Sequence, residues 1–75
     1  MEILHKKFDS GEDVYYVTDK SAFYKLVYDD GDLKREASDR DTFEERREDS
    51  DFENVTEDDL PGAVHSSVSD LIELF

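Results

Sequence analysis

The first half of the chain alternates between short apolar segments and clusters of polar turn residues. Segments 14–18 and 23–28 consist mainly of β-branched and aromatic side chains, which are typical of strands. Looser apolar patterns over residues 2–8 and 33–37 predict two further strands. The Asp-Gly dipeptide before the last of these segments favours a tight hairpin. This half therefore predicts an antiparallel meander.

The C-terminal segment 60–75 has the periodicity of a helix. Its large apolar residues recur at intervals of three and four, which places them on one helical face. They are Leu60, Val64, Val68, Leu71, Ile72 and Phe75. Pro61 fits the first turn, where its missing N–H is not needed. We expect an α+β fold, in which one C-terminal amphipathic helix packs on one face of a meander of four to five strands.

Both faces of the predicted sheet carry large apolar side chains, because neighbouring residues of a strand point to opposite faces. One helix covers only one face. We expect the acidic segment, a second copy of the chain or a partner to cover the other, and a homodimer is the simplest such interface. Tyrosines tolerate partial exposure, which is the alternative explanation. The candidate apolar interface consists of Tyr15, Val17, Tyr24 and Tyr28.

The segment 38–59 is ambiguous, since its only large apolar residues are Phe43, Phe52 and Val55. A helix could begin at Ser38, with a capping partner three residues later. No apolar stripe supports that helix, so a strand over 42–48 followed by an extended arm is favoured. Disorder of part of this segment is a third interpretation.

The length of 75 residues corresponds to a single domain, 1–75. It divides into a β-rich half (1–37), an acidic segment (38–59) and a helix (60–75). The chain has no cysteine, no secretory signal pattern and no apolar run near the roughly 20 residues of a membrane span, so we expect a cytoplasmic protein. Its four tyrosines, five phenylalanines and periodic apolar segments argue against full disorder.

The net charge is −13, from 22 acidic and 9 basic residues, which excludes direct binding to nucleic acid and to anionic membrane. Residues 36–59 hold 12 of the acids and 3 arginines, so most of the charge lies there. The candidate partner-binding acidic surface consists of Asp39, Asp41, Glu44, Glu45, Glu48, Asp49, Asp51 and Glu53. In an extended segment, alternate residues lie roughly 6.6 Å apart, close to the spacing of backbone phosphates. This surface could occupy the basic site of a nucleic-acid-binding protein, as acidic viral inhibitors and anti-restriction mimics do.

Salt adaptation is the competing explanation of the acidity. Aspartate outnumbers glutamate by 13 to 9 and there are only 5 lysines, as in an acid-rich proteome of halophilic type. At about 1 M salt the Debye length falls to about 3 Å, so self-repulsion between the carboxylates would nearly vanish. On this interpretation the acids indicate the habitat and not the function.

No pattern predicts catalysis, a cofactor or a metal. An EF-hand alignment beginning at Asp49 fails at Asn54, where glycine is needed, and at Leu60, where the bidentate glutamate must stand. His5 is interpreted as an exposed strand residue and His65 as a residue on the flank of a helix. We therefore expect a small acidic protein-interaction domain that is not an enzyme, with the inhibitor or mimic as the alternative.

Overall fold

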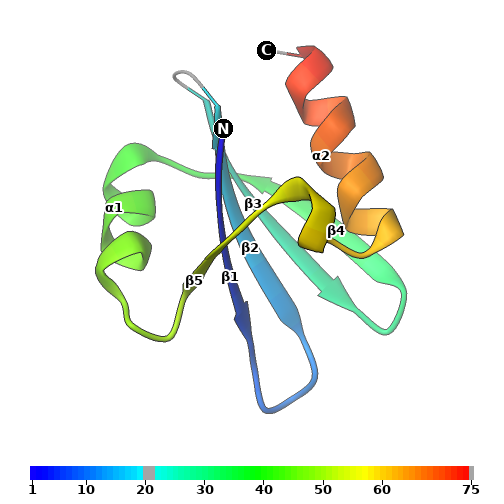
Figure 1. Ribbon diagram of the computed structural model, residues 1–75, viewed down its shortest axis with the longest axis horizontal. Helices are drawn as coiled ribbons and strands as arrows, with labels where there is room; N and C mark the ends of the chain where they lie inside the picture. Colours follow the sequence, from blue (N-terminus) through cyan, green and yellow to red (C-terminus); the bar gives the residue numbers. More distant parts are fainter. Residues whose placement is uncertain (20–21, 75) are drawn as a thin grey trace.

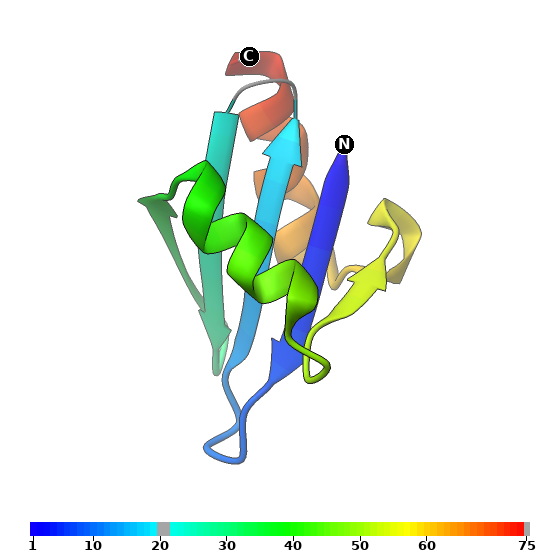
Figure 2. The same cartoon turned by 90° about the vertical axis from the view of Figure 1, so that its left-hand side faces the viewer.

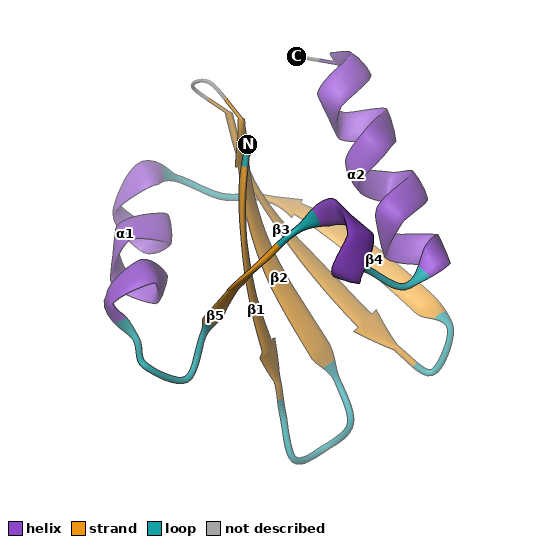
Figure 3. Ribbon diagram, viewed as in Figure 1, coloured by secondary structure: helices purple, strands orange, loops and turns teal. Residues whose placement is uncertain are grey.

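The computed structural model describes residues 1–19 and 22–74, with side chains described as far as residue 71. Within these residues, a five-stranded antiparallel sheet has one helix on each of its faces (Figures 1 and 3). The elements in chain order are β1 (Glu2–Lys7), β2 (Asp13–Asp19), β3 (Ala22–Asp29), β4 (Asp32–Ala37), α1 (Arg40–Glu48), β5 (Glu53–Val55), a 3-10 turn (Glu57–Asp59) and α2 (Gly62–Leu74). The predicted α+β class and C-terminal helix are confirmed.

The strand order is β4-β3-β2-β1-β5, so the first four strands form the predicted meander. β5 extends the sheet on the other side of β1, where Val55 lies opposite Ile3 and Glu53 lies opposite His5. The β3–β4 hairpin turns at Asp30 and Gly31, whose φ angles are 49° and 85°. Two successive positive φ angles define the turn type whose twist matches the flanking strands, which explains the Asp-Gly pair.

α2 covers the face that holds the larger core. Val64 and Val68 of α2 are fully buried and pack with Val17 and Leu26 of the central strands. The predicted helical stripe is confirmed over the described residues, where Leu60, Val64, Val68 and Leu71 are all buried. Phe75 and the side chain of Ile72 lie outside the described residues.

The start of α2 is shifted slightly from the prediction. Pro61 lies just before the helix, and its carbonyl accepts a hydrogen bond of 2.8 Å from the His65 N–H. The preceding acids form the separate 3-10 turn, in which the Asp59 carboxylate accepts hydrogen bonds of 3.2 Å from the Thr56 N–H and hydroxyl. The turn thereby connects β5, at the edge of the sheet, to the start of α2.

The strand expected over 42–48 is wrong, because this segment forms α1. Asp39, and not Ser38, caps the helix: its side chain accepts a hydrogen bond of 2.7 Å from the Thr42 N–H. Phe43 is the only buried residue of α1, with an exposed fraction of 1%. A nine-residue helix is marginal by itself, so α1 depends on the packing of Phe43 against the sheet. The strand that the segment does contribute lies later, at β5.

α1 crosses the face opposite α2 obliquely and leaves the strand ends near the β1–β2 turn uncovered (Figure 2). The core of this face consists of the buried residues Leu4, Val14, Tyr16 and Phe43, with Phe23, Val27 and Phe52 packed against them. The acidic segment thus covers the second face, which is the first of the three coverings expected from the sequence.

The candidate apolar interface needs correction for two of its four residues. Tyr15 and Val17 are 3% and 0% exposed and belong to the core beneath α2. Tyr24 and Tyr28 are half-buried at the margin of the same core. Tyr15 and Val17 therefore belong to the intramolecular core, because α2 covers the face on which they lie.

Candidate functional site

α1 presents a face on which every ionisable group is a carboxylate. Asp41, Glu44, Glu45 and Glu48 are spaced i, i+3, i+4 and i+7, which places them on one side of the helix. All four are exposed, whereas Phe43 lies on the opposite side in the core. The four carboxylates occupy about 10 Å of helix axis at 1.5 Å per residue. We call these four residues the acidic face.

The three arginines of the helix point away from the acidic face and contact aromatic rings of the core. The guanidinium carbons lie 5.4, 5.5 and 5.2 Å from ring centroids. The pairs are Arg40 with Phe23, Arg46 with Tyr16, and Arg47 with Phe43. Hydrogen bonding to Tyr16 raises the pKa of the Arg46 guanidinium. The only ion pair between a described basic group and the acidic face joins Arg46 to Glu45, at 3.8 Å. Cation–aromatic packing thus segregates the two signs of charge across one short helix.

Both ends of the acidic face continue into further carboxylates. The hydrogen bond from the Thr42 N–H lowers the pKa of Asp39, so its carboxylate stays charged as the helix cap. At the other end, the Asp49 carboxylate accepts a hydrogen bond of 2.9 Å from the Asp51 N–H. Asp51 lies 3.5 Å from the Lys6 ammonium, and Glu53 is exposed on β5.

The extended ladder of carboxylates expected for the acidic surface is wrong in geometry. Asp41 lies within a helix and Asp51 within a turn, so alternate residues do not line one extended edge. The structure nevertheless places seven of the eight predicted surface residues in exposed positions, with Asp49 half-buried. The helical spacing of positions 41, 44, 45 and 48 is visible in the sequence. The periodicity of the charged residues could therefore have identified α1 where the apolar pattern does not.

Sequence reasoning missed a cluster on the α2 side of the sheet. The ring of His5 stacks on Tyr15, with centroids 4.6 Å apart, and its Nε2 lies 2.8 Å from Oδ1 of Asp13. His5 is therefore a partly buried residue with two partners, not a freely exposed one. Burial, followed by the nearby charge of Asp13, raises the pKa of Tyr15 to about 12. His65 lies on exposed α2 surface, 3.9 Å from Glu57.

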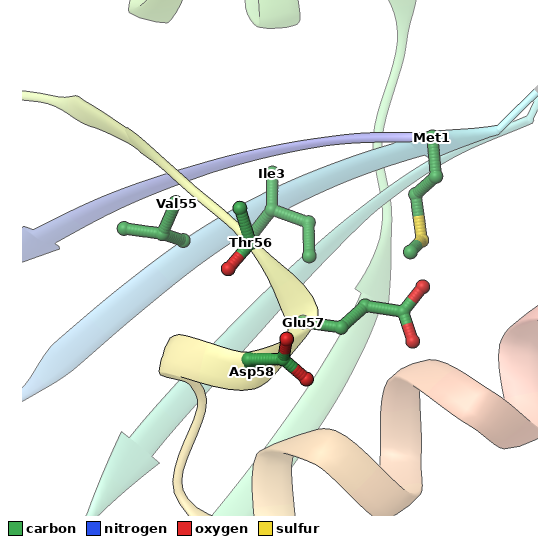
Figure 4. Close-up of a pocket in the computed structure, with 6 residues that line it drawn as sticks. All are labelled: Met1, Ile3, Val55, Thr56, Glu57 and Asp58. Carbon is green, nitrogen blue, oxygen red and sulfur yellow. The ribbon is translucent and has the colours of Figure 1, made fainter.

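A surface cavity of about 480 Å³ lies where β1, β5 and the 3-10 turn meet (Figure 4). Its polar groups come from Thr56, Glu57 and Asp58, and the side chains of Met1 and Ile3 complete it. The Thr56 hydroxyl donates a hydrogen bond of 3.2 Å to the Asp59 carboxylate, which also accepts from the Thr56 N–H, so this contact caps the 3-10 turn. Among the side chains of residues 1–19 and 22–71, no three His, Asp or Glu residues form a group that could hold a metal ion.

Neither of the two described helices combines the length and the apolar character that a membrane crossing requires. No protein-family model, no curated protein and no solved structure matches the chain. The fold and the segregated charge of α1 are therefore the basis for a functional proposal.

Proposed function

We propose that this protein is a small, non-catalytic interaction domain whose acidic face docks on a basic surface of a protein partner. The segregation of charge on α1 is the observation that carries the proposal. Salt adaptation requires acidic groups on the surface but does not require that arginines be withdrawn from them. A helix face that offers a partner only carboxylates produces a strong local field, which steers association with a basic surface.

The docking proposal is tested by neutralising the acidic face without changing its shape. The variant Glu44→Gln/Glu45→Gln/Glu48→Gln retains helix propensity, because Gln and Glu are comparable helix formers. Asp41 is left unchanged because an acid in the first turn stabilises the helix. The tagged chain should recover from an extract a partner with a basic surface, and the triple variant should lose it.

A matched control neutralises three exposed acids at the β4 edge of the sheet. The residues are Asp29, Asp32 and Glu36 of β3 and β4, replaced by Asn, Asn and Gln. Both variants raise the net charge by the same three units, so a general electrostatic effect would weaken them equally. Retention of the partner by the acidic-face variant would contradict the proposal.

A nucleic-acid mimic is the alternative form of the same docking. Further carboxylates lie beyond both ends of α1, with Asp39 before it and Asp49, Asp51 and Glu53 after it. Duplex DNA carries one phosphate per 3.4 Å of each strand, and the acidic face carries four charges over about 10 Å. If the partner's docking site is its nucleic-acid site, added duplex DNA should release the partner. A partner that stays bound in excess DNA would exclude mimicry and leave the docking proposal intact.

We also propose a cytoplasmic location, which the absence of cysteine supports. The excess of aspartate supports an origin in an acid-rich proteome. A homodimer stays a prediction, although α1 removes the uncovered sheet face that motivated it. Light scattering at high micromolar concentration and moderate salt tests it, and a monomer mass would contradict it.

A further inference from the structure

A second cavity, of about 310 Å³, opens on the α1 side of the sheet at the strand ends that α1 leaves uncovered. Three cationic side chains line it: Lys6 from β1, Lys25 from β3 and Arg46 from α1. Three aromatic side chains line it as well, namely Phe8, Tyr16 and Phe52. We call these six residues the basic pocket. Its volume lies at the lower end of the range of small-molecule sites, about 300 to 1,000 Å³.

The basic pocket is rich in positive charge, although the chain as a whole is strongly acidic. Acids outnumber bases by 22 to 9, yet the pocket collects three cations and only one acid, Asp49, in its lining. The three cations come from elements far apart in the sequence, so the tertiary fold brings them together. Like charges gathered around a cavity repel one another, and an anion inside it relieves that repulsion.

Among the described residues, two of the three cations form ion pairs and the third does not. Lys6 pairs with the exposed Asp51 at 3.5 Å, and Arg46 lies 3.8 Å from Glu45. Lys25 is half-buried in the middle of the sheet, where Glu36 is its opposite residue on β4. Where side chains are described, in residues 1–19 and 22–71, no carboxylate forms an ion pair with the Lys25 ammonium. Lys25 is thus the cation best placed to take an external anion.

The aromatic residues of the basic pocket contribute apolar surface to its lining. Phe52 meets Tyr16 edge to face, with centroids 5.6 Å apart. The Lys6 ammonium lies 4.7 Å from the Phe8 ring centroid and 5.8 Å from that of Phe52, between the two rings. Phe8 is 39% exposed, so its ring is accessible to a ligand in the pocket. An aromatic ligand in the pocket would cover it.

We infer that the basic pocket binds a small organic anion in which a carboxylate or phosphate is attached to an aromatic ring. The anionic group meets Lys25, Lys6 and Arg46, and the ring packs against Phe8 and the neighbouring aromatic wall. This site lies beyond the interaction function proposed above and does not use the acidic face. At about 0.15 M salt the Debye length is about 8 Å, so distant carboxylates are screened while contacts inside the pocket are not.

The inference is tested by NMR titration of the full ¹⁵N-labelled chain with phenyl phosphate in about 0.15 M salt. We expect saturable shifts of the backbone amides of the basic pocket. Inorganic phosphate and benzyl alcohol, which each carry half of the ligand chemistry, should bind roughly tenfold or more weakly. Absence of saturable shifts up to about 10 mM phenyl phosphate, or equal binding of the fragments, would overturn the inference.

Variants of the full chain separate a built site from general charge attraction. Lys25→Met keeps the unbranched apolar stem and should weaken phenyl phosphate binding roughly tenfold. Lys34→Met makes the same charge change at an exposed position of β4 outside the basic pocket and should leave the affinity unchanged. Equal weakening by both changes would contradict the assignment.

Phe8→Ala provides a second test that does not depend on charge. Because Phe8 is partly exposed, its removal should leave the fold intact, which circular dichroism can verify. The affinity for phenyl phosphate should fall toward that of inorganic phosphate, while the affinity for inorganic phosphate stays the same. Unchanged preference for phenyl phosphate would show that the ring does not lie where we place it.

Discussion

The carboxylate of Glu2 on β1 accepts two hydrogen bonds from the guanidinium of Arg47 on α1, at 2.8 Å from Nη2 and 3.1 Å from Nε. The two residues are 45 positions apart, so this bidentate pair ties the first strand to the C-terminal turn of the helix. Arg47 also lies over the ring of Phe43, the buried residue of α1, so one side chain contacts both Glu2 and Phe43.

Replacing Arg47 by Ala should destabilise the protein by about 1 kcal/mol, since the pair is half-exposed and solvent screens it. Urea unfolding followed by circular dichroism measures this change. Arg35→Ala, on the exposed edge strand β4, removes the same side chain where no ion pair is formed within the described residues. It should change the midpoint little, and equal effects of the two variants would argue against the Glu2 contact.

Asp39→Ala should lower the urea midpoint and the helical signal, because the Thr42 N–H loses its acceptor. Asp39→Asn keeps an acceptor and should lose less. The lowered pKa of Asp39 stabilises the fold above its ordinary value of 3.8, and this stabilisation disappears as the pH falls through the lowered pKa. The stability difference between wild type and Asp39→Asn should therefore shrink on acidification, and a constant difference would contradict the assignment.

Phe43→Ala should be the most damaging single change in α1. The ring is 1% exposed and packs against Phe23 with centroids 5.8 Å apart. Truncation of a buried Phe costs about 3–5 kcal/mol, a large part of the stability of a small domain. We expect loss of the cooperative unfolding transition or a strongly lowered midpoint. The partly exposed Phe8, changed to Ala, is the control that should unfold nearly as the wild type does.

Tyr15 should ionise near its pKa of about 12 in an ultraviolet titration of the folded protein. The folded pKa lies above the ordinary value of 10.0, so the unfolded chain loses this proton first. Tyr15 therefore contributes stability that is complete below pH 10 and is lost as the pH rises toward 12. Tyr15→Phe should flatten this alkaline loss, and an unchanged slope would contradict the assignment.

Salt should stabilise the chain, because its net charge of −13 repels itself. If salt adaptation contributes to the acidity, the urea midpoint should rise steeply with KCl into the molar range. The Glu44→Gln/Glu45→Gln/Glu48→Gln variant should respond less to salt than the wild type. A wild-type chain already folded and cooperative in about 50 mM salt would remove the argument for salt adaptation.

The sheet and α2 were predictable because their patterns depend on apolar residues alone. Alternation in β2 and β3 assigned Tyr16 and Val17 to opposite faces, and the three-to-four spacing of Val64, Val68 and Leu71 defined the buried side of α2. Burial of apolar surface is the dominant favourable term in folding, so these patterns leave a direct trace in the sequence.

α1 was not predictable by the same rule, because a single buried residue, Phe43, anchors it. Arginines supply further contacts with the sheet: Arg40 and Arg46 lie over aromatic rings of the strands, and Arg47 donates hydrogen bonds to Glu2. Arginines are polar positions in an apolar pattern, so the apolar periodicity of segment 38–59 does not indicate a helix. The residues of the acidic surface were identified from the sequence. Their expected extended arrangement was wrong, because α1 leaves no apolar stripe in the sequence.

The amino-acid sequence by itself determined the four-strand meander, the C-terminal helix and the concentration of acids in 36–59. Only the tertiary structure decided that the arginines turn inward and the carboxylates outward, and that Lys6, Lys25 and Arg46 line one pocket. Local sequence patterns indicate which side chains are buried on folding. Which charged groups meet one another depends on contacts between elements far apart in the chain, and those exist only once the two helices have packed on the two faces of the sheet.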